Sequence, residues 1–326
     1  MQNKPATVVI LGTGGTIAGT AAEPGDNVGY SAAQIGVAQL VAEMPALASA
    51  SAGALTGAMT EPAIEAEQVA QIDSKDMDFT VWRRLAERVS HHLARAQVQG
   101  IVITHGTDTL EETAYFLQRV LAPRKPVVLA AAMRPATSLL ADGPQNLLDA
   151  VGLARLGGAQ GVMAVLAGQV HSGLDVRKTH TYRLNAFGSG DAGVLGQIEE
   201  GVLRRHRPWP QGEPLGLDRL PIHGADWPRV ELLTSHAGAG GALVRALCAS
   251  GVQGIVVAGT GNGSLHHALE AALVGAQASG VRVWRSSRCG DGVVIERSDE
   301  ALPGAGALTP VQARIELMLE LCAGVD

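Results

Sequence analysis

The sequence predicts an α/β protein: a larger N-terminal domain with an open, mostly parallel sheet flanked by helices, followed by a smaller C-terminal α/β domain. Three observations predict this fold. Short apolar runs recur along the chain, amphipathic stretches separate them, and a proline-rich stretch interrupts the alternation. The 326 residues, 46% of them hydrophobic, are enough to build two hydrophobic cores.

The apolar runs are rich in Val and Ile and end in Gly or Thr. They lack the polar alternation of a sheet with one wet face, so we expect strands buried on both faces, as in a parallel sheet covered by helices. In chain order they are TVVILGTGG (7–15), GIVITHGTD (100–108), PVVLAAAMRP (126–135), GVMAVLAG (161–168) and GIVVAGTGNG (254–263).

The stretches between these runs have helical periodicity. Residues 80–96 keep apolar side chains on one side and Arg or Glu on the other, and residues 110–121 and 241–250 behave similarly. Alternating strands and helices of this kind form open α/β sheets, which bind ligands at the carboxyl ends of their strands. Candidate functional residues are therefore sought where the apolar runs end.

A domain boundary is predicted from five prolines that cannot lie inside a helix or a central strand. We expect an N-terminal domain at 1–205, a proline-rich linker at 206–228 and a C-terminal domain at 229–326, which restarts with RVELLTSHAGAG. The uncharged small-residue stretch 46–59 is expected to be a surface excursion.

Composition excludes several classes of protein. A net charge of −6 and 3% aromatic residues argue against a nucleic-acid partner. Cys248, Cys289 and Cys322 form no CxxC pair, which favours a reducing compartment and no thiolate zinc site. The longest uncharged stretch, 246–269, is too polar to cross a membrane, and the N-terminal apolar run breaks at Gly12. We therefore expect a cytoplasmic protein without a membrane or nucleic-acid partner.

The first apolar run ends in GTGGTIAG, which suggests a phosphate-binding loop. Its spacing fails the dinucleotide fingerprint, because the sixth position counted from Gly12 is Ile17, and counted from Gly259 it is Ser264. The chain also lacks the Gly-Lys-Ser/Thr of a P-loop. We expect no nucleotide cofactor. A tight turn alone would explain the glycines but not Thr16, whose hydroxyl follows a Gly pair at a strand end.

A second cluster is THGTDTLEETAYF, residues 104–116. Thr107 and Asp108 are predicted to end a buried strand, with a helix starting directly after them. Capping of that helix by Asp108 or Thr109 would account for one of these groups, but not for the whole cluster of polar residues at one strand end.

Adjacent pairs of titratable residues have simpler explanations. His91–His92 and His266–His267 point to different helix faces, so we predict solvated or capping roles and no metal site. Glu111–Glu112 lie in the first turn of the predicted helix, where the helix dipole favours carboxylates without any role in catalysis.

TGGTIAG (13–19) and HGTDTLEETAYF (105–116) together resemble the two threonine-containing signatures of the bacterial-type L-asparaginase family, here a cytoplasmic-type member. The resemblance covers most of the chain. Further segments similar to that family are GYSAAQIGVAQLV (29–41), IDSKDM (72–77), AAMRPATSLLADGPQNL (131–147), DVRKTHT (175–181), GTGNGSL (259–265), RSSR (285–288) and LTPVQARIEL (308–317).

The resemblance implies a cofactor-free enzyme without a metal, which hydrolyses L-asparagine to L-aspartate and ammonia through an acyl-enzyme. It implies that Thr16 is the nucleophile and that Tyr30 assists its deprotonation. Thr107, Asp108 and Lys178 resemble a second catalytic set, in which the ammonium lowers the cost of an alkoxide or helps activate water. The sequence leaves open which threonine carries the covalent intermediate, and we favour Thr16.

Substrate contacts are also implied by the resemblance. Ser74 matches the contact to the α-carboxylate, Asp108 suits the α-ammonium, and the backbone at Ala132 matches the position that receives the carboxamide. Asn262 matches a contribution from a neighbouring subunit, which implies a homotetramer. Lys75 stands where better-known members often carry Gln, so we expect it to influence α-carboxylate binding and the preference between asparagine and glutamine.

Other functions stay open at this stage. Within the family these are a glutaminase-asparaginase of broad range and a subunit that supplies ammonia to a partner enzyme. A catalytically silent amino-acid sensor on the same fold is disfavoured by the complete set of Thr16, Thr107, Asp108 and Lys178, and a nucleotide-dependent oxidoreductase is opposed by the glycine spacing. Glu296 is a candidate acid that we leave outside the site.

Overall fold

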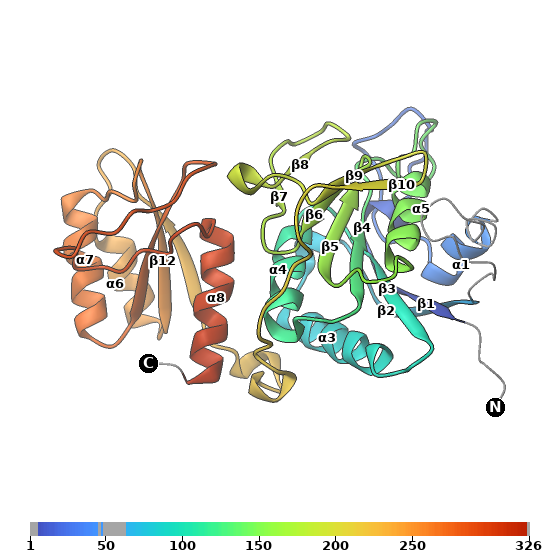
Figure 1. Cartoon of the computed structure of the whole chain (residues 1–326). Coiled ribbons are helices and arrows are strands. Elements are labelled where there is room, and N and C mark those ends of the chain that lie inside the picture. Colours follow the sequence, from blue (N-terminus) through green and yellow to red (C-terminus); the bar gives the residue numbers. More distant parts are fainter. Residues whose placement is uncertain (1–5, 45–46, 48–62, 325–326) are drawn as a thin grey trace. The chain divides into compact units, whose positions relative to one another are not determined.

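The protein is an α/β protein with a large sheet and a separate smaller one, as the sequence predicts (Figure 1). The computed structural model describes residues 6–44, 47 and 63–324. The chain divides into two compact units, one ending at Leu217 and the other starting at Asp218, a boundary that falls inside the proline-rich stretch. The expected surface excursion at 46–59 lies outside the described residues, except for Leu47.

The first unit is built on an eight-stranded sheet. Its strand order is β10-β9-β6-β5-β4-β3-β1-β2, and the five strands from β5 to β2 run parallel while β6, β9 and β10 pair antiparallel. The strands are β1 Thr7–Gly14, β2 Ala63–Ile72, β3 Val98–Thr104, β4 Pro126–Ala130, β5 Gly161–Leu166, β6 Gln169–Ser172, β9 Gly196–Glu199 and β10 Val202–Arg205.

Helices cover both faces of this sheet (Figure 1). They are α1 Val37–Ala42, α3 Phe79–Leu93, α4 Leu110–Leu121 and α5 Gly143–Ala154. Helices α1 and α5 contribute to a core with alternate residues of β1, β3, β4, β5 and β6, and α3 and α4 lie on the opposite face. Every residue of β1, β4 and β5 is buried, which explains the apolar runs without polar alternation.

One predicted boundary is wrong. The strand in the run 100–108 ends at Thr104, not at Thr107 and Asp108, and α4 starts at Leu110. Residues 105–109 therefore form a connection at the carboxyl edge of the sheet, tied to β4 at its start by the His105 N–H, which donates to the Ala130 carbonyl oxygen at 2.9 Å. A separate two-stranded sheet, β7 Arg177–Lys178 with β8 Phe187–Gly188, follows β6 in the chain.

The second unit has a parallel three-stranded sheet, order β11-β12-β13, formed by β11 Val230–Thr234, β12 Gly254–Gly259 and β13 Arg282–Ser287. Its helices are α6 Ala242–Ala249, α7 His267–Ala278 and α8 Pro310–Ala323, and α6 and α7 form a core with the sheet. Among the described helices, none is both long and apolar enough to span a membrane.

Candidate active site

Thr16 directly follows the end of the first strand. Gly14 and Gly15 have φ of 106° and 80°, values that disfavour side chains, and they turn the chain into a short 3-10 turn that starts at Thr16. The Thr16 side chain is buried, and its Oγ1 lies 2.7 Å from the Tyr30 hydroxyl. The structure therefore brings the predicted nucleophile and its predicted assistant into hydrogen-bond contact.

The turns after β1 and β3 touch through their glycines. A Cβ added to Gly15 would lie 2.3 Å from both Cα and N of Gly106, so this approach requires a glycine at position 15. Strands β1 and β3 are parallel neighbours, and their carboxyl ends meet at one edge of the sheet. Thr16 and Thr107, each the residue after one of these glycines, therefore leave the sheet at the same place.

Thr107 and Asp108 are joined by one ammonium group. Lys178 Nζ donates to Thr107 Oγ1 at 2.9 Å and to Asp108 Oδ1 at 2.7 Å. Thr107 is buried, whereas the Asp108 side chain is 53% exposed and can accept a further donor from solvent or a ligand. The three residues of the predicted second set thus lie together, although Lys178 comes from the distant strand β7.

Ser74 packs against the same connection. Its Oγ accepts a hydrogen bond from the Asp108 backbone N–H at 3.2 Å, and a Cβ on Gly106 would lie 2.4 Å from that oxygen. Lys75 behaves differently. Its ammonium binds Asp73 Oδ2 at 2.6 Å, its side chain is 64% exposed, and the Asp73 carboxylate raises the pKa of Lys75.

Thr109 occupies the N-cap position of α4, but its side chain makes no cap hydrogen bond to the helix. Its hydroxyl donates instead to the Ser74 backbone oxygen at 2.7 Å. Thr109 is thus the N-cap residue, as the alternative considered from the sequence has it, but its hydroxyl does not cap the helix and instead ties the connection after β3 to the turn at Ser74.

Ala132 lies in the turn after β4, fully buried and in one apolar cluster with Ile17. Two backbone N–H groups, at 133 and 134, donate to the Asp142 carboxylate, each at 3.0 Å. Asn146 donates to the backbone oxygen of the residue before Ala132 at 2.8 Å. Sequence reasoning did not single out these two anchors, although both lie in the family-like segment 131–147.

Glu111 contacts the main chain of the catalytic lysine candidate. Its Oε2 accepts the Lys178 backbone N–H at 2.5 Å. Burial raises the pKa of Glu111 to about 7, although this hydrogen bond acts in the opposite direction. The helix dipole favours the ionised form of a carboxyl group in the first turn. It therefore does not by itself explain the raised pKa of Glu111 or its contact with Lys178.

A buried chain of hydrogen bonds supports Gly106. Trp82 Nε1 donates to Thr113 Oγ1, and that hydroxyl lies 2.9 Å from His105 Nε2. His105 Nδ1 lies 2.7 Å from the Gly106 carbonyl oxygen, which can only accept, so the hydrogen of the ring is on Nδ1. Burial lowers the pKa of His105 to about 4, so the ring is neutral at physiological pH.

Asn262 belongs to the second unit, in the connection between β12 and α7. Its side-chain amide pairs with both backbone groups of Ile295, donating at 2.8 Å and accepting at 2.7 Å.

Glu296 accepts from the Gly304 N–H. The His266 ring accepts from the Ala268 N–H and caps α7, as predicted, whereas the prediction of a solvated or capping role is wrong for His92, which is buried and lies 2.8 Å from Glu67 Oε2. Within the described residues, no three His, Cys, Asp or Glu side chains group as a metal site.

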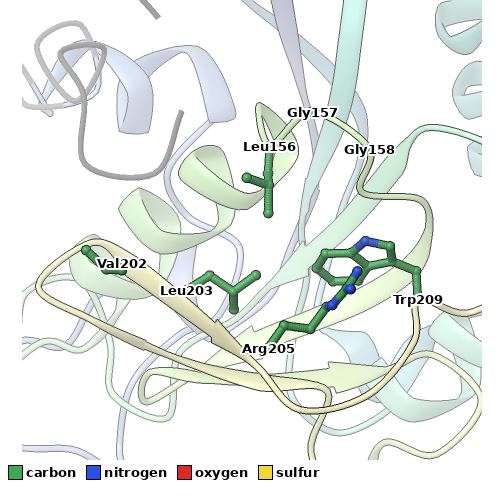
Figure 2. Close-up of a pocket in the computed structure, with 7 residues that line it drawn as sticks. All are labelled: Leu156, Gly157, Gly158, Val202, Leu203, Arg205 and Trp209. Atoms are coloured by element: carbon green, nitrogen blue, oxygen red, sulfur yellow. The ribbon is translucent and has the colours of Figure 1, made fainter. Parts of the chain in front are cut away.

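Figure 2 shows a pocket whose labelled lining residues include none of the predicted site residues. Its volume is about 380 Å³. It is lined by the turn after α5, by β10 and by Trp209, and the Arg205 guanidinium lies 5.2 Å from the centre of the Trp209 ring. None of its lining side chains is a hydroxyl, thiol or carboxylate that could serve as nucleophile or base. We therefore take the edge with Thr16 and Thr107 as the candidate active site.

Comparison with known proteins agrees with this choice. The family described as "Asparaginase, N-terminal" matches residues 7–211, and "Glutaminase/Asparaginase C-terminal domain" matches residues 229–326. The chain belongs to the asparaginase family. The resemblance found in the two threonine signatures is confirmed, and the chain is an enzyme of the amidohydrolase type that this family represents.

Similar asparaginases match over nearly the whole chain. A crystal structure of a probable cytoplasmic L-asparaginase from Campylobacter jejuni is 38% identical, with a TM-score of 0.88, covering 97% of this chain and 95% of that chain. L-asparaginase 2 of Bacillus subtilis is 37% identical over 96% of this chain and 81% of its own length. A glutaminase-asparaginase of Pseudomonas fluorescens is 35% identical over 100% and 89%.

Proposed function

We propose that this asparaginase hydrolyses L-asparagine to L-aspartate and ammonia through an ester on Thr16. The observation that carries the proposal is the close approach of Gly15 and Gly106 at the carboxyl edge of the sheet. Thr16 and Thr107 directly follow these two glycines, so their backbones lie near one another. Amide hydrolysis through an acyl-enzyme needs a nucleophile, a route for its proton and a group that activates water. The side chains at this edge can supply all three.

In the first half-reaction, Thr16 Oγ1 attacks the side-chain carboxamide carbon of asparagine while its proton passes to the Tyr30 oxygen, 2.7 Å away, and the hydrogen that Tyr30 already carries is released for the leaving nitrogen. The tetrahedral intermediate collapses to the Thr16 ester, and the leaving nitrogen takes a proton and departs as ammonia. We assign the backbone at Ala132 as the receptor of the carboxamide, because its buried turn is held rigidly by Asp142.

In the second half-reaction, water adds to the ester carbon, and Thr16 leaves with a proton as L-aspartate is released. Thr107 accepts a hydrogen bond from Lys178, so its hydroxyl proton is directed away from the ammonium and can point at water. The half-exposed Asp108 carboxylate balances the ammonium and is assigned to the α-ammonium of the substrate.

Ser74 and Lys75 are assigned to the α-carboxylate end of the substrate. The Ser74 hydroxyl accepts from the Asp108 backbone, which leaves its own hydrogen for a carboxylate oxygen. Lys75 contributes positive charge at longer range, since its ammonium is bound to Asp73.

A homotetramer, with Asn262 of a neighbouring subunit completing each site, is part of this proposal. The Asn262 side chain uses one N–H and one oxygen lone pair in its hydrogen bonds to Ile295, so a second N–H and a second lone pair can bind a further partner. Native mass spectrometry tests the tetramer.

A cytoplasmic location is supported by the name of the similar Campylobacter jejuni protein, whereas a Haemophilus influenzae relative is named as periplasmic. Cell fractionation distinguishes the two.

A broad-range glutaminase-asparaginase is the second candidate. It is favoured by three similar proteins that carry this name, at 34–35% identity. The two candidates differ in one measurement, the ratio of kcat/KM for L-asparagine to that for L-glutamine. A ratio near one would favour the broad-range enzyme.

The decisive experiment measures ammonia release from L-asparagine, L-glutamine and D-asparagine by wild type, Thr16→Ala, Thr107→Val and Tyr30→Phe. After acid quenching, mass spectrometry locates any aspartyl ester. We expect an ester on Thr16 in wild type, more of it in Thr107→Val, and none in Thr16→Ala. Loss of one catalytic proton-transfer group lowers kcat by roughly 10²-fold to 10⁴-fold. Full activity in Thr16→Ala or Thr107→Val would reject the role assigned to that threonine.

A further inference from the structure

Lys178 is held at both ends by the same short segment. Its ammonium contacts Thr107 and Asp108, and its backbone N–H is bound by the Glu111 carboxylate. All three partners lie within residues 107–111, between the end of β3 and the first turn of α4. The Lys178 side chain therefore spans the gap between Glu111, which binds its main chain, and Thr107, which binds its ammonium.

The strand that carries Lys178 is short. Strand β7 consists of two residues and, among the strands of the described residues, it pairs with the two-residue strand β8. After β8, the Ser189 hydroxyl lies 2.9 Å from Nδ1 of the buried His171. Such a short hairpin is marginal without external contacts, so a side chain that binds its main chain has a large influence on its position.

We propose that Glu111 is a positioning residue of the proposed hydrolysis, which holds the Lys178 main chain so that the ammonium reaches Thr107 and Asp108. This inference rests on the proposed function for its effect on rate. Glu111 does not touch the reacting atoms. It acts through Lys178, and its carboxylate is a stronger acceptor for the Lys178 N–H than a neutral group.

The charges around Glu111 are consistent with this role. Glu112 on α4 opposes its ionisation, whereas Arg177 and Lys178 on β7 favour it. Burial outweighs these charges and raises the pKa of Glu111 to about 7. The carboxyl therefore gains a proton as the pH falls below about 7, and the charge-assisted hydrogen bond to Lys178 becomes an ordinary one.

The test compares Glu111→Ala and Glu111→Gln with Glu112→Ala, a matched control that removes a carboxylate from the same helical turn. A lost hydrogen bond to a charged group corresponds to roughly a 10-fold to 100-fold effect. We expect Glu111→Ala to lower kcat by about that factor with KM changed by less than about 3-fold. Glu111→Gln, whose amide oxygen accepts the same N–H, should retain kcat within about 10-fold, and Glu112→Ala should retain the wild-type value.

The pH profile adds a readout that a merely structural role would not move. Wild-type kcat should decrease below about pH 7 to the level of Glu111→Gln, and the variant should lack this step. In Glu112→Ala the step should move to lower pH, because Glu112 raises the pKa of Glu111. A step at the same pH in all three proteins would overturn the role of Glu111.

A second measurement does not depend on turnover. The Lys178 side chain is 21% exposed and held by two partners, so an amine-reactive reagent such as acetic anhydride should modify it slowly. Peptide mass spectrometry should find faster modification of Lys178 in Glu111→Ala and an unchanged rate in Glu112→Ala. Unchanged kcat and unchanged modification in Glu111→Ala would overturn the inference. If wild type released no ammonia while this labelling difference held, the proposed function would fall and the positioning of Lys178 would stand.

Discussion

Replacement of Gly15 by Ala tests the contact that brings the two threonines together. Gly15 has φ 80° and ψ −173°, a conformation essentially restricted to glycine, and another residue there costs roughly 1–3 kcal/mol. The new Cβ would also lie 2.3 Å from Cα and N of Gly106. Because both neighbours are backbone atoms, the overlap adds roughly 1–3 kcal/mol. We therefore expect Gly15→Ala to lower the free energy of unfolding by about 2–6 kcal/mol.

Gly158 supplies the matched control. Its φ is 79°, nearly that of Gly15, but a Cβ there would meet no atom within 4 Å. Gly158→Ala should therefore lose only the conformational cost of a positive φ, roughly 1–3 kcal/mol as at Gly15. Urea unfolding of both variants measures the difference, which isolates the overlap with Gly106.

Activity supplies the second part of this test. An outward shift of Thr16 by about 1 Å costs roughly 10²-fold in rate, so ammonia release by folded Gly15→Ala should decrease by about that factor, with Gly158→Ala close to wild type. The reasoning is refuted if Gly15→Ala unfolds at the same urea concentration as Gly158→Ala and releases ammonia at the wild-type rate.

Three further predictions concern charged side chains. Lys75→Gln should change the asparagine-to-glutamine ratio of kcat/KM, and an unchanged ratio would remove Lys75 from substrate selection. Arg88 lowers the pKa of Glu67 to about 2, below the ordinary 4.5, so this pair stabilises the fold above pH 4.5 and ceases to do so as the pH falls through 2. Urea titrations should show Glu67→Gln less stable than wild type at pH 7 and equal to it near pH 2. Glu111→Gln should show the opposite sign, more stable than wild type at pH 8 and equal to it at pH 4, because the raised pKa of Glu111 makes ionisation oppose folding.

The fold was largely predictable because its strands are buried on both faces. Continuous Val and Ile runs can only be covered by helices, and the predicted runs 7–15, 126–135, 161–168 and 254–263 all contain strands of the structure. The predicted end of the run 100–108 is wrong, since nothing in the sequence marks Thr104 as the last residue of the strand. His105 is as buried as the strand before it, so burial does not mark the boundary.

The site was predictable where two signatures carry it, at Thr16 and Thr107, and much less where single residues complete it. Lys178 lies 70 positions after Asp108, and no local pattern relates them. Asp142 and Asn146 hold the turn at Ala132 through backbone groups, a function that other side chains with a hydrogen-bond acceptor or donor at a suitable distance could also serve. Such contacts depend on the path of the chain, which composition and periodicity do not encode.

Glu111 illustrates why a correct local rule can hide a functional residue. A carboxylate in the first turn of a helix normally stabilises the fold, and that rule accounts for its place in the sequence. Here the pKa of Glu111 is raised from 4.5 to about 7, so between these values the unfolded chain releases the proton more readily and the free energy of unfolding decreases as the pH rises. Above pH 7 the ionised carboxyl therefore costs stability. A neutral side chain at position 111 would avoid this loss of stability. We therefore explain the presence of Glu111 by its hydrogen bond to the Lys178 N–H, which serves the active site and not the fold.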